Sequence, residues 1–248
     1  MQAWGWRIGF FAGAVLAVVV FFIRRRLDET ISYENVAARS DRRKSSIGTL
    51  FRDHPREALL VMALTAGGTA AFYAYTIYLQ KFLANTSGFD RATASRIMTV
   101  ALGAMLIIQP LAGSLSDRVG RKPLMIFFGV SATLFTYPLF LALERTTETI
   151  PAFMLVMAAL IIVSGYTAIN AIIKAEMFPA DVRALGVALP YAIANAIFGG
   201  TAEYIALWMK NIGHERWFYV YISALAACSL IAYVRMRETK TNSRIEED

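Results

Sequence analysis

Seven apolar stretches, each close to the length needed to cross a bilayer, constrain this sequence more than any other feature. A helix of about 20 residues crosses the roughly 30 Å of hydrocarbon, where backbone groups can be satisfied only in helices or closed barrels. The expected spans are residues 8–23, 58–80, 97–115, 123–143, 151–173, 186–208 and 217–234. The sequence therefore predicts an all-α integral membrane protein with seven transmembrane helices.

Composition and charge exclude several other classes. Apolar residues make up 57% of the chain and charged residues 17%, and the charges gather between the apolar stretches. The net charge of +7 comes from basic residues beside the spans, so we expect no nucleic-acid partner. A single cysteine, Cys228, excludes a disulfide framework or a four-cysteine metal site. The spans carry no Ser-His, His-Glu or paired-aspartate constellation, so we expect no enzyme, no metal and no cofactor.

The distribution of lysine and arginine predicts the orientation. Four segments on one side of the spans contain 18 of the 25 basic residues: 24–57, 116–122, 174–185 and 235–248. Because basic loops are retained in the cytoplasm, the N-terminus is expected in the periplasm and the C-terminus in the cytoplasm. Three arginines follow the first stretch and no cleavage site precedes them, which favours a spanning helix over a signal peptide.

The ends of the first and last spans resemble each other. Each is followed by arginines and then by Glu-Thr, at Glu29-Thr30 and Glu238-Thr239, 209 residues apart. Many secondary transporters consist of two repeated halves, so this spacing indicates that most of a first half is missing. The alternative is that any helix leaving a membrane ends in basic residues. The expected parts are 1–23, the last helix of the N-terminal half; 24–57, a cytoplasmic central loop; 58–236, a C-terminal six-helix bundle; and 237–248, a cytoplasmic tail.

The loop between the third and fourth spans carries a specific motif. Residues 113–122 read Gly-Ser-Leu-Ser-Asp-Arg-Val-Gly-Arg-Lys, which resembles the G-x-x-x-D-R-x-G-R-K signature of the major facilitator superfamily. We expect Gly113 to permit close helix approach, Gly120 to permit a tight turn, and the charges to form a breakable latch. The resemblance implies that Asp117 faces the start of the eleventh helix of that fold and that Arg121 pairs with Glu176. The expected cytoplasmic gate comprises Gly113, Asp117, Arg118, Gly120, Arg121, Lys122, Glu176 and Arg183.

A narrower resemblance covers most of the chain. Three segments are similar to the α-ketoglutarate permease branch of the metabolite:proton symporters: 72–88, 174–186 and 195–204. This resemblance implies the sixth helix and second half of a transporter that carries a small organic acid, such as α-ketoglutarate or a related dicarboxylate, with protons by alternating access. It also implies the bacterial inner membrane as location. The expected partners are the lipid bilayer, the organic acid, protons, and either a missing N-terminal half or a second copy.

Polar residues inside the spans follow helical faces. Tyr166, Asn170 and Lys174 are spaced by four residues, as are Tyr191, Asn195 and Gly199. Buried polar groups are unfavourable in a membrane unless they face a cavity or another helix. The candidate cavity residues are Tyr73, Tyr75, Tyr78, Gln80, Gln109, Tyr166, Asn170, Lys174, Tyr191 and Asn195. As alternatives, the tyrosines pack between helices, and Lys174 extends to lipid headgroups or pairs with Glu176.

Glu203 is the one acidic residue inside a predicted span. Inserting an acidic residue at mid-membrane costs about 2.5–3.5 kcal/mol, so its presence needs a reason. We expect it either to take up a proton or to hold an outer gate by pairing with Lys81 or Lys210. The alternative is a simple interfacial ion pair.

Two other functional classes fit the span count. One is a transport-inactive fragment of a transporter. The other is a seven-helix receptor, which the predicted orientation permits. The last span has no lysine for a retinal Schiff base, and a receptor has no reason to carry the motif at 113–122.

Overall fold

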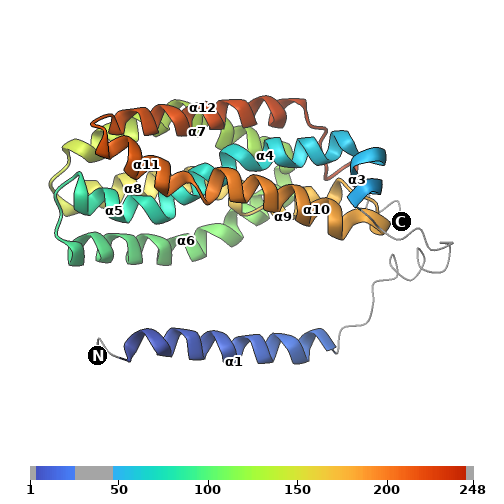
Figure 1. Cartoon of the computed structure of the whole chain (residues 1–248), viewed down its shortest axis with the longest axis horizontal. Helices are drawn as coiled ribbons and strands as arrows, with labels where there is room; N and C mark the ends of the chain where they lie inside the picture. Colours follow the sequence, from blue (N-terminus) through green and yellow to red (C-terminus); the bar gives the residue numbers. More distant parts are fainter. Residues whose placement is uncertain (1–3, 26–46, 244–248) are drawn as a thin grey trace. The chain divides into compact units, whose positions relative to one another are not determined.

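The computed structural model describes residues 4–25 and 47–243, and every regular element in these ranges is a helix (Figure 1). Seven helices or helix pairs are long and apolar enough to cross a membrane: Arg7–Arg25, Pro55–Asn85, Arg91–Val119, Arg121–Arg145, Thr149–Glu176, Ala180–Asn211 and Glu215–Arg235. The predicted all-α fold and its seven spans are therefore confirmed.

The chain divides into two compact units, residues 1–43 and 44–248. The first contains α1 (Gly5–Arg25), whose apolar side chains, such as Phe10 and Leu16, are exposed around the helix. A helix that is apolar on all sides is typical of a membrane span.

The second unit contains all the other elements. They are α3 (Ile47–Asp53), α4 (Pro55–Tyr73), η1 (Ala74–Tyr78), α5 (Leu79–Asn85), α6 (Arg91–Val119), α7 (Arg121–Arg145), α8 (Thr149–Thr167), α9 (Asn170–Glu176), α10 (Ala180–Ala194), η2 (Asn195–Gly199), α11 (Ala202–Asn211) and α12 (Glu215–Arg235).

Local signals set the ends of these helices. Pro55 occupies the first turn of α4, where its missing N–H needs no partner. Asp90 caps α6 by accepting from the backbone N–H groups of Ala92 and Thr93, both at 3.0 Å. Because such capped polar turns continue the helices, the observed spans extend beyond the apolar stretches that predicted them.

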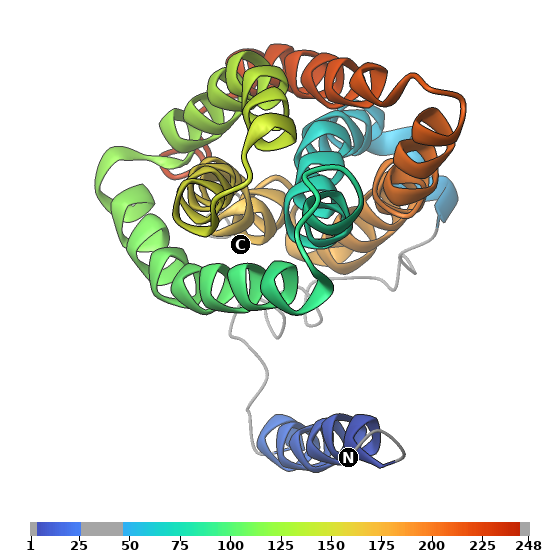
Figure 2. The same ribbon diagram turned by 90° about the vertical axis from the view of Figure 1, so that its left-hand side faces the viewer.

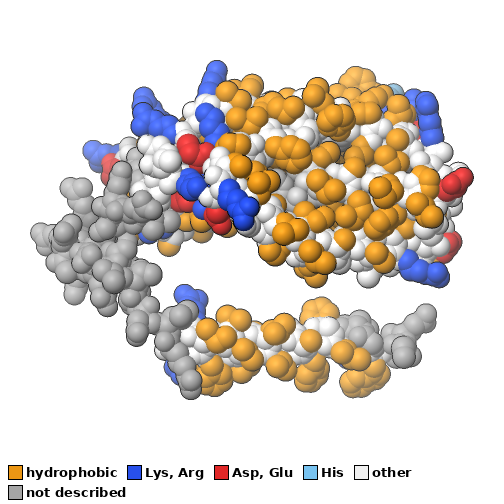
Figure 3. All heavy atoms as spheres, turned by 180° about the vertical axis from the view of Figure 1, so that it is seen from behind, with side chains coloured by type: hydrophobic (Ala, Val, Ile, Leu, Met, Phe, Trp, Pro, Cys, Tyr) orange, Lys and Arg blue, Asp and Glu red, His pale blue; other side chains and the backbone are white. Residues whose placement is uncertain are grey.

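The helices of the second unit surround two central spans. Figure 2 looks along the bundle and shows α4–α5 and α8 near the centre. The helices α7 and α12 pack extensively on each other, α12 also packs on α4, and α6 packs on α8. Among the described elements, α6 makes no extensive contact with α10 or α11. Figure 3 shows apolar side chains over the middle of the visible face and charged side chains toward its ends, as a bilayer-spanning protein requires.

Hydroxyl groups join α12 to α4 inside the bundle. Ser229 Oγ accepts from the Gly67 backbone N–H at 2.8 Å and donates to the Ala63 carbonyl at 2.7 Å. Tyr233 donates to the Leu64 carbonyl at 2.9 Å. Without water, these hydroxyls find their partners on the backbone of the neighbouring helix, which requires the two helices to lie close together.

Three spans are interrupted in the middle. The span Pro55–Asn85 contains the π-helical segment η1, and the span Ala180–Asn211 contains η2. The span Thr149–Glu176 changes from α8 to α9 after Thr167. Such interruptions are frequent at functional sites because they release backbone groups and alter side-chain directions.

The segment 47–53 belongs to the predicted cytoplasmic central loop, residues 24–57. It forms α3, whose Leu50 is fully buried, whereas Ile47 and Phe51 are exposed. This part of the loop is thus a helix packed on the bundle, and residues 26–46 lie outside the described residues.

We predict that Gly67→Ala destabilises the second unit. An added Cβ would lie 2.5 Å from the Leu225 carbonyl oxygen, so α4 and α12 would have to separate. Overpacking of this kind costs about 2 kcal/mol. Denaturant titration of the purified chain in detergent measures the effect. Gly103→Ala is the control because its Cβ would have no neighbour within 4 Å, and equal stability of the two variants would contradict the prediction.

Candidate functional site

The motif at residues 113–122 brings three helices together through Arg121. Its guanidinium donates to Ser116 Oγ at 2.8 Å and to the Asp117 carboxylate. Its Nε lies 3.7 Å from Glu176 Oε1, and both Arg121 and Glu176 are buried. The contact joins the end of α6, the start of α7 and the end of α9.

Glu238 completes this cluster, although the sequence did not single it out as a site residue. Its carboxylate accepts from the backbone N–H groups of Arg121 at 2.9 Å and Lys122 at 3.0 Å, at the start of α7. Gly120 has φ +103° there, and a Cβ would lie 2.6 Å from Glu238 Oε2. Burial tends to raise the pKa of Glu238, but hydrogen bonds from these N–H groups and from Lys240 together lower it. The sequence signal that could have pointed to Glu238 was its place in the pair Glu238-Thr239, which repeats Glu29-Thr30.

Other residues of the expected gate lie differently. Asp117 contacts Arg121, and its backbone carbonyl accepts from Lys240. Arg183 Nε donates to the Phe178 carbonyl at 3.0 Å. Close helix approach does not explain Gly113, because an added Cβ would meet nothing within 4 Å in the described residues. Arg118 is exposed and Lys122 is partly exposed.

The candidate cavity residues separate into two groups. Tyr75, Tyr78 and Tyr166 are buried within the bundle. The Tyr75 hydroxyl lies 2.5 Å from Thr136 Oγ1, and Tyr78 donates to Glu215 Oε1 at 2.8 Å. Tyr75 and Tyr78 therefore pack between helices, because the Tyr75 hydroxyl contacts α7 and the Tyr78 hydroxyl contacts α12.

The second group lies at or near the surface. Gln80 and Tyr191 are exposed, and Tyr73, Gln109, Asn170 and Asn195 are partly exposed. Asn195 Oδ1 accepts from Thr69 Oγ1 at 2.8 Å, and Gln109 donates to Thr167 Oγ1 at 2.5 Å. Their contacts connect neighbouring spans while part of each side chain stays accessible, as expected for the wall of a polar passage.

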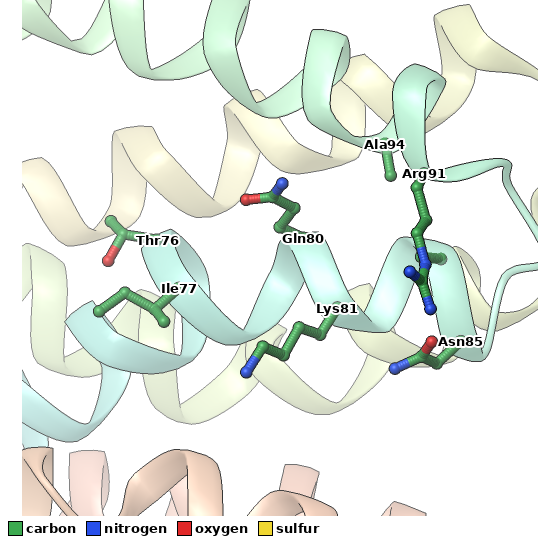
Figure 4. Close-up of a pocket in the computed structure, with 8 residues that line it drawn as sticks. Thr76, Ile77, Gln80, Lys81, Asn85, Arg91 and Ala94 are labelled. Carbon is green, nitrogen blue, oxygen red and sulfur yellow. The ribbon is translucent and has the colours of Figure 1, made fainter. Parts of the chain in front are cut away.

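A groove of about 490 Å³ lies beside η1, α5 and the start of α6. Figure 4 shows Gln80, Lys81 and Asn85 projecting from α5 and Arg91 from α6. The lining contains two cations and two amides and no acidic residue, and its volume suits a small ligand. Asn85 and Arg91 were not predicted as site residues, because both lie at helix ends outside the polar stripes.

Lys81 also contacts Glu203, which joins α5 to α11. Both side chains are partly exposed, by 49% and 31%. Lys210 instead lies 3.6 Å from Glu215 and donates to the Asn85 carbonyl at 2.9 Å. Of the two partners expected for Glu203, the structure therefore brings Lys81 to it.

Lys174 is almost fully buried, with 2% of the residue exposed. Its ammonium nitrogen lies 3.1 Å from Asn170 Oδ1 and 4.0 Å from the centroid of the Tyr191 ring. Glu176, the expected acidic partner, contacts Arg121 instead. Within the described part of the chain, no cluster of three or more His, Cys, Asp or Glu residues could hold a metal ion.

These features define a class: a polytopic helical membrane protein whose interrupted spans carry polar side chains and whose helix ends are held by charged clusters. The sugar (and other) transporter family model matches residues 32–247. The chain therefore belongs to this family, which is part of the major facilitator superfamily.

Several curated relatives agree with this assignment. The chain is 47% identical to the alpha-ketoglutarate permease of Escherichia coli K12 over 245 residues, covering 99% of this chain and 56% of the relative. It is 28% identical to the ectoine/proline transporter ProP of Corynebacterium glutamicum, covering 96% of this chain and 49% of the relative. The chain thus spans about half the length of the relatives it matches. No solved structure matches it.

We predict that Arg121→Ala lowers the free energy of unfolding by about 3 kcal/mol, because Glu176 would remain as an unpaired buried charge. Adding Glu176→Gln should recover part of the loss. Denaturant titration of the single and double variants measures the coupling. Strictly additive effects would show that the two side chains do not interact.

We predict that Glu238→Gln lowers the free energy of unfolding at neutral pH by about 0.5 kcal/mol, because a partly exposed carboxylate at a helix N-terminus is screened by solvent. The pKa of Glu238 is lowered in the folded chain, so its carboxylate contributes fully to the stability at pH values above the ordinary pKa of a glutamate. This contribution to the stability is lost as the pH falls below about 4.3 and then through the lowered pKa. The thermal unfolding of both proteins is measured from about pH 3 to about pH 7, which covers the range in which glutamate titrates. The two melting temperatures should converge at the acid end of this range. A difference in melting temperature that stays constant with pH would contradict the prediction.

Proposed function

We propose that the chain forms one wall of a secondary transporter that carries a small dicarboxylate with protons across the bacterial inner membrane. The main support is the 47% identity to the alpha-ketoglutarate permease over nearly the whole chain. The polar groove beside α5 supplies Lys81 and Arg91, and cations are suitable partners for carboxylate groups.

The second wall would come from another half. The relatives are about twice as long as this chain, and partly exposed polar residues such as Tyr73 and Asn195 have no function toward lipid. We propose that either an N-terminal half or a second copy covers this face, with the N-terminus in the periplasm and the C-terminus in the cytoplasm. Residues 1–23 would then be the last helix of the first half, with 24–57 as the central loop and 237–248 as the tail.

Charged clusters at the two ends of the bundle would control access. We propose that the cluster of Asp117, Arg121, Glu176 and Glu238 stabilises one conformation at the cytoplasmic end. Lys81 and Glu203 would do the same at the periplasmic end, because both are partly exposed and each lies on a different helix. Glu203 is also the candidate proton acceptor, since protonation would release Lys81.

A complementation experiment tests the proposed transport. The chain is expressed with the missing first part of the Escherichia coli permease in cells that lack their own permease, and uptake of radiolabelled α-ketoglutarate is measured. Uptake that exceeds the level of either part alone, and that falls when the pH gradient is collapsed, is expected. The second candidate, a transport-inactive fragment, would show no uptake in any combination.

We predict that Glu203→Gln in this combination lowers pH-driven uptake about a hundredfold, the lower end of the contribution of one proton-transferring side chain, while exchange of internal for external α-ketoglutarate falls by less than about threefold. Trp217→Phe serves as a control at the same membrane surface. Unchanged pH-driven uptake would exclude Glu203 as the proton acceptor, and an equal loss of both activities would indicate a structural role in the Lys81 contact.

A further inference from the structure

We infer that Lys174, which lies outside the groove beside α5, binds one carboxylate group of the transported anion, and that the Tyr191 ring covers it in the anion-free protein. The inference rests on the proposed function and identifies one position within it.

The Lys174 side chain points into the span and not toward its end. Its ammonium nitrogen contacts Asn170, one turn earlier, and lies 5.8 Å from the ring centroid of Tyr166, two turns earlier. Helical side chains lean toward the N-terminus of their helix, and here that direction leads to the middle of the span Thr149–Glu176. Extension toward lipid headgroups, the alternative considered from the sequence, does not occur in this conformation.

Among the described residues, the charge on Lys174 has no carboxylate partner. None lies within 4.0 Å of its nitrogen in residues 4–25 and 47–243, and Glu176 contacts Arg121. By contrast, Lys81 and Lys210 each contact a glutamate. Removing an ammonium from water costs free energy. One amide oxygen and one aromatic face offset less of this cost than a carboxylate would, so an incoming anion would be bound favourably.

Tyr191 occupies the position that an anion would need. Its ring centroid is 4.0 Å from the Lys174 nitrogen, a cation–π distance, and 38% of the residue is exposed. The ring therefore lies on the ammonium while part of the residue stays accessible. A carboxylate can replace the ring because a charge-assisted hydrogen bond is stronger than contact with the quadrupole of the ring.

Asn170 prepares the site for one end of a small anion. Its Nδ2 donates to the Thr167 carbonyl at 3.1 Å, which directs Oδ1 toward the ammonium. The arrangement supplies one cation to a single carboxylate, which suits a dicarboxylate whose second group is bound elsewhere.

Acylation of individual lysines tests whether the Tyr191 ring covers Lys174. The purified chain is treated with acetic anhydride, and the rate at each lysine is measured by mass spectrometry. We expect Tyr191→Ala to accelerate acylation of Lys174 at least fivefold, with no change at Lys81. Tyr191→Phe, which keeps the ring, and Tyr204→Ala, at an exposed tyrosine on α11, are the matched controls. Equal acylation rates at Lys174 in the unaltered chain and in Tyr191→Ala would overturn the proposal that the ring covers Lys174.

The same assay tests anion binding. In Tyr191→Ala, 1 mM α-ketoglutarate (on the order of the upper range of typical KM values) should slow acylation of Lys174 at least threefold, whereas its uncharged dimethyl ester should not. Faster acylation at every lysine would show that the variant is unfolded. The uptake assay described below then decides whether Lys174 binds the anion. Absence of protection in a folded variant would overturn the assignment of Lys174.

Uptake by the combined halves separates this inference from the proposed function. Lys174→Met should raise the KM for α-ketoglutarate at least tenfold, Lys174→Arg should stay within threefold, and Arg145→Met, which removes an exposed charge, should have no effect. Unchanged KM in Lys174→Met would overturn the role of Lys174 and leave the proposed function intact. No uptake by the unaltered combination would overturn both.

Discussion

The absence of water in the hydrocarbon core is the constraint on which the rest of this structure depends. Each polar group in a span must find a protein partner or face a region that water can enter. Inside the bundle, Ser229 and Tyr233 satisfy this requirement on the backbone of α4, and Tyr75 does so on Thr136. Other polar side chains of the spans, including Gln80 and Asn195, are exposed or partly exposed. Their accessibility is the physical basis for proposing a passage beside this bundle.

The charged clusters at the helix ends follow a related principle. Arg121 and Glu176 are buried, but Arg121 Nε and Glu176 Oε2 have no hydrogen-bond partner in the described residues, so their contact is not a fully satisfied network. A contact of this kind stabilises one arrangement of α6, α7 and α9 without making it permanent. The more exposed contact of Lys81 with Glu203 is weaker by the same reasoning. Two separable contacts of unequal burial fit the proposed alternation of two conformations.

Hydropathy alone predicted the seven spans, because burial of long apolar stretches leaves few alternatives. The polar faces were less predictable for a specific reason. Tyr73, Tyr75, Tyr78 and Gln80 span the π-helical segment η1, where an extra residue in the turn shifts the angular positions of all later side chains. Periodicity of four therefore could not show that Tyr75 and Tyr78 enter the core while Gln80 is exposed. The contact of Glu238 with the start of α7 joins residues 117 positions apart, and no local pattern encodes such a pairing.

Water access to the middle of the spans tests the central claim most directly. In a Cys228→Ser background, single cysteines replace Asn195, in the middle of the span Ala180–Asn211, and Leu106, at similar depth but exposed on an apolar face. The chain is expressed with the first part of the Escherichia coli permease, and reaction with a membrane-impermeant maleimide is measured in intact membranes. The account predicts reaction at position 195 and none at position 106. Equal protection of both positions would contradict a water-filled passage on this face.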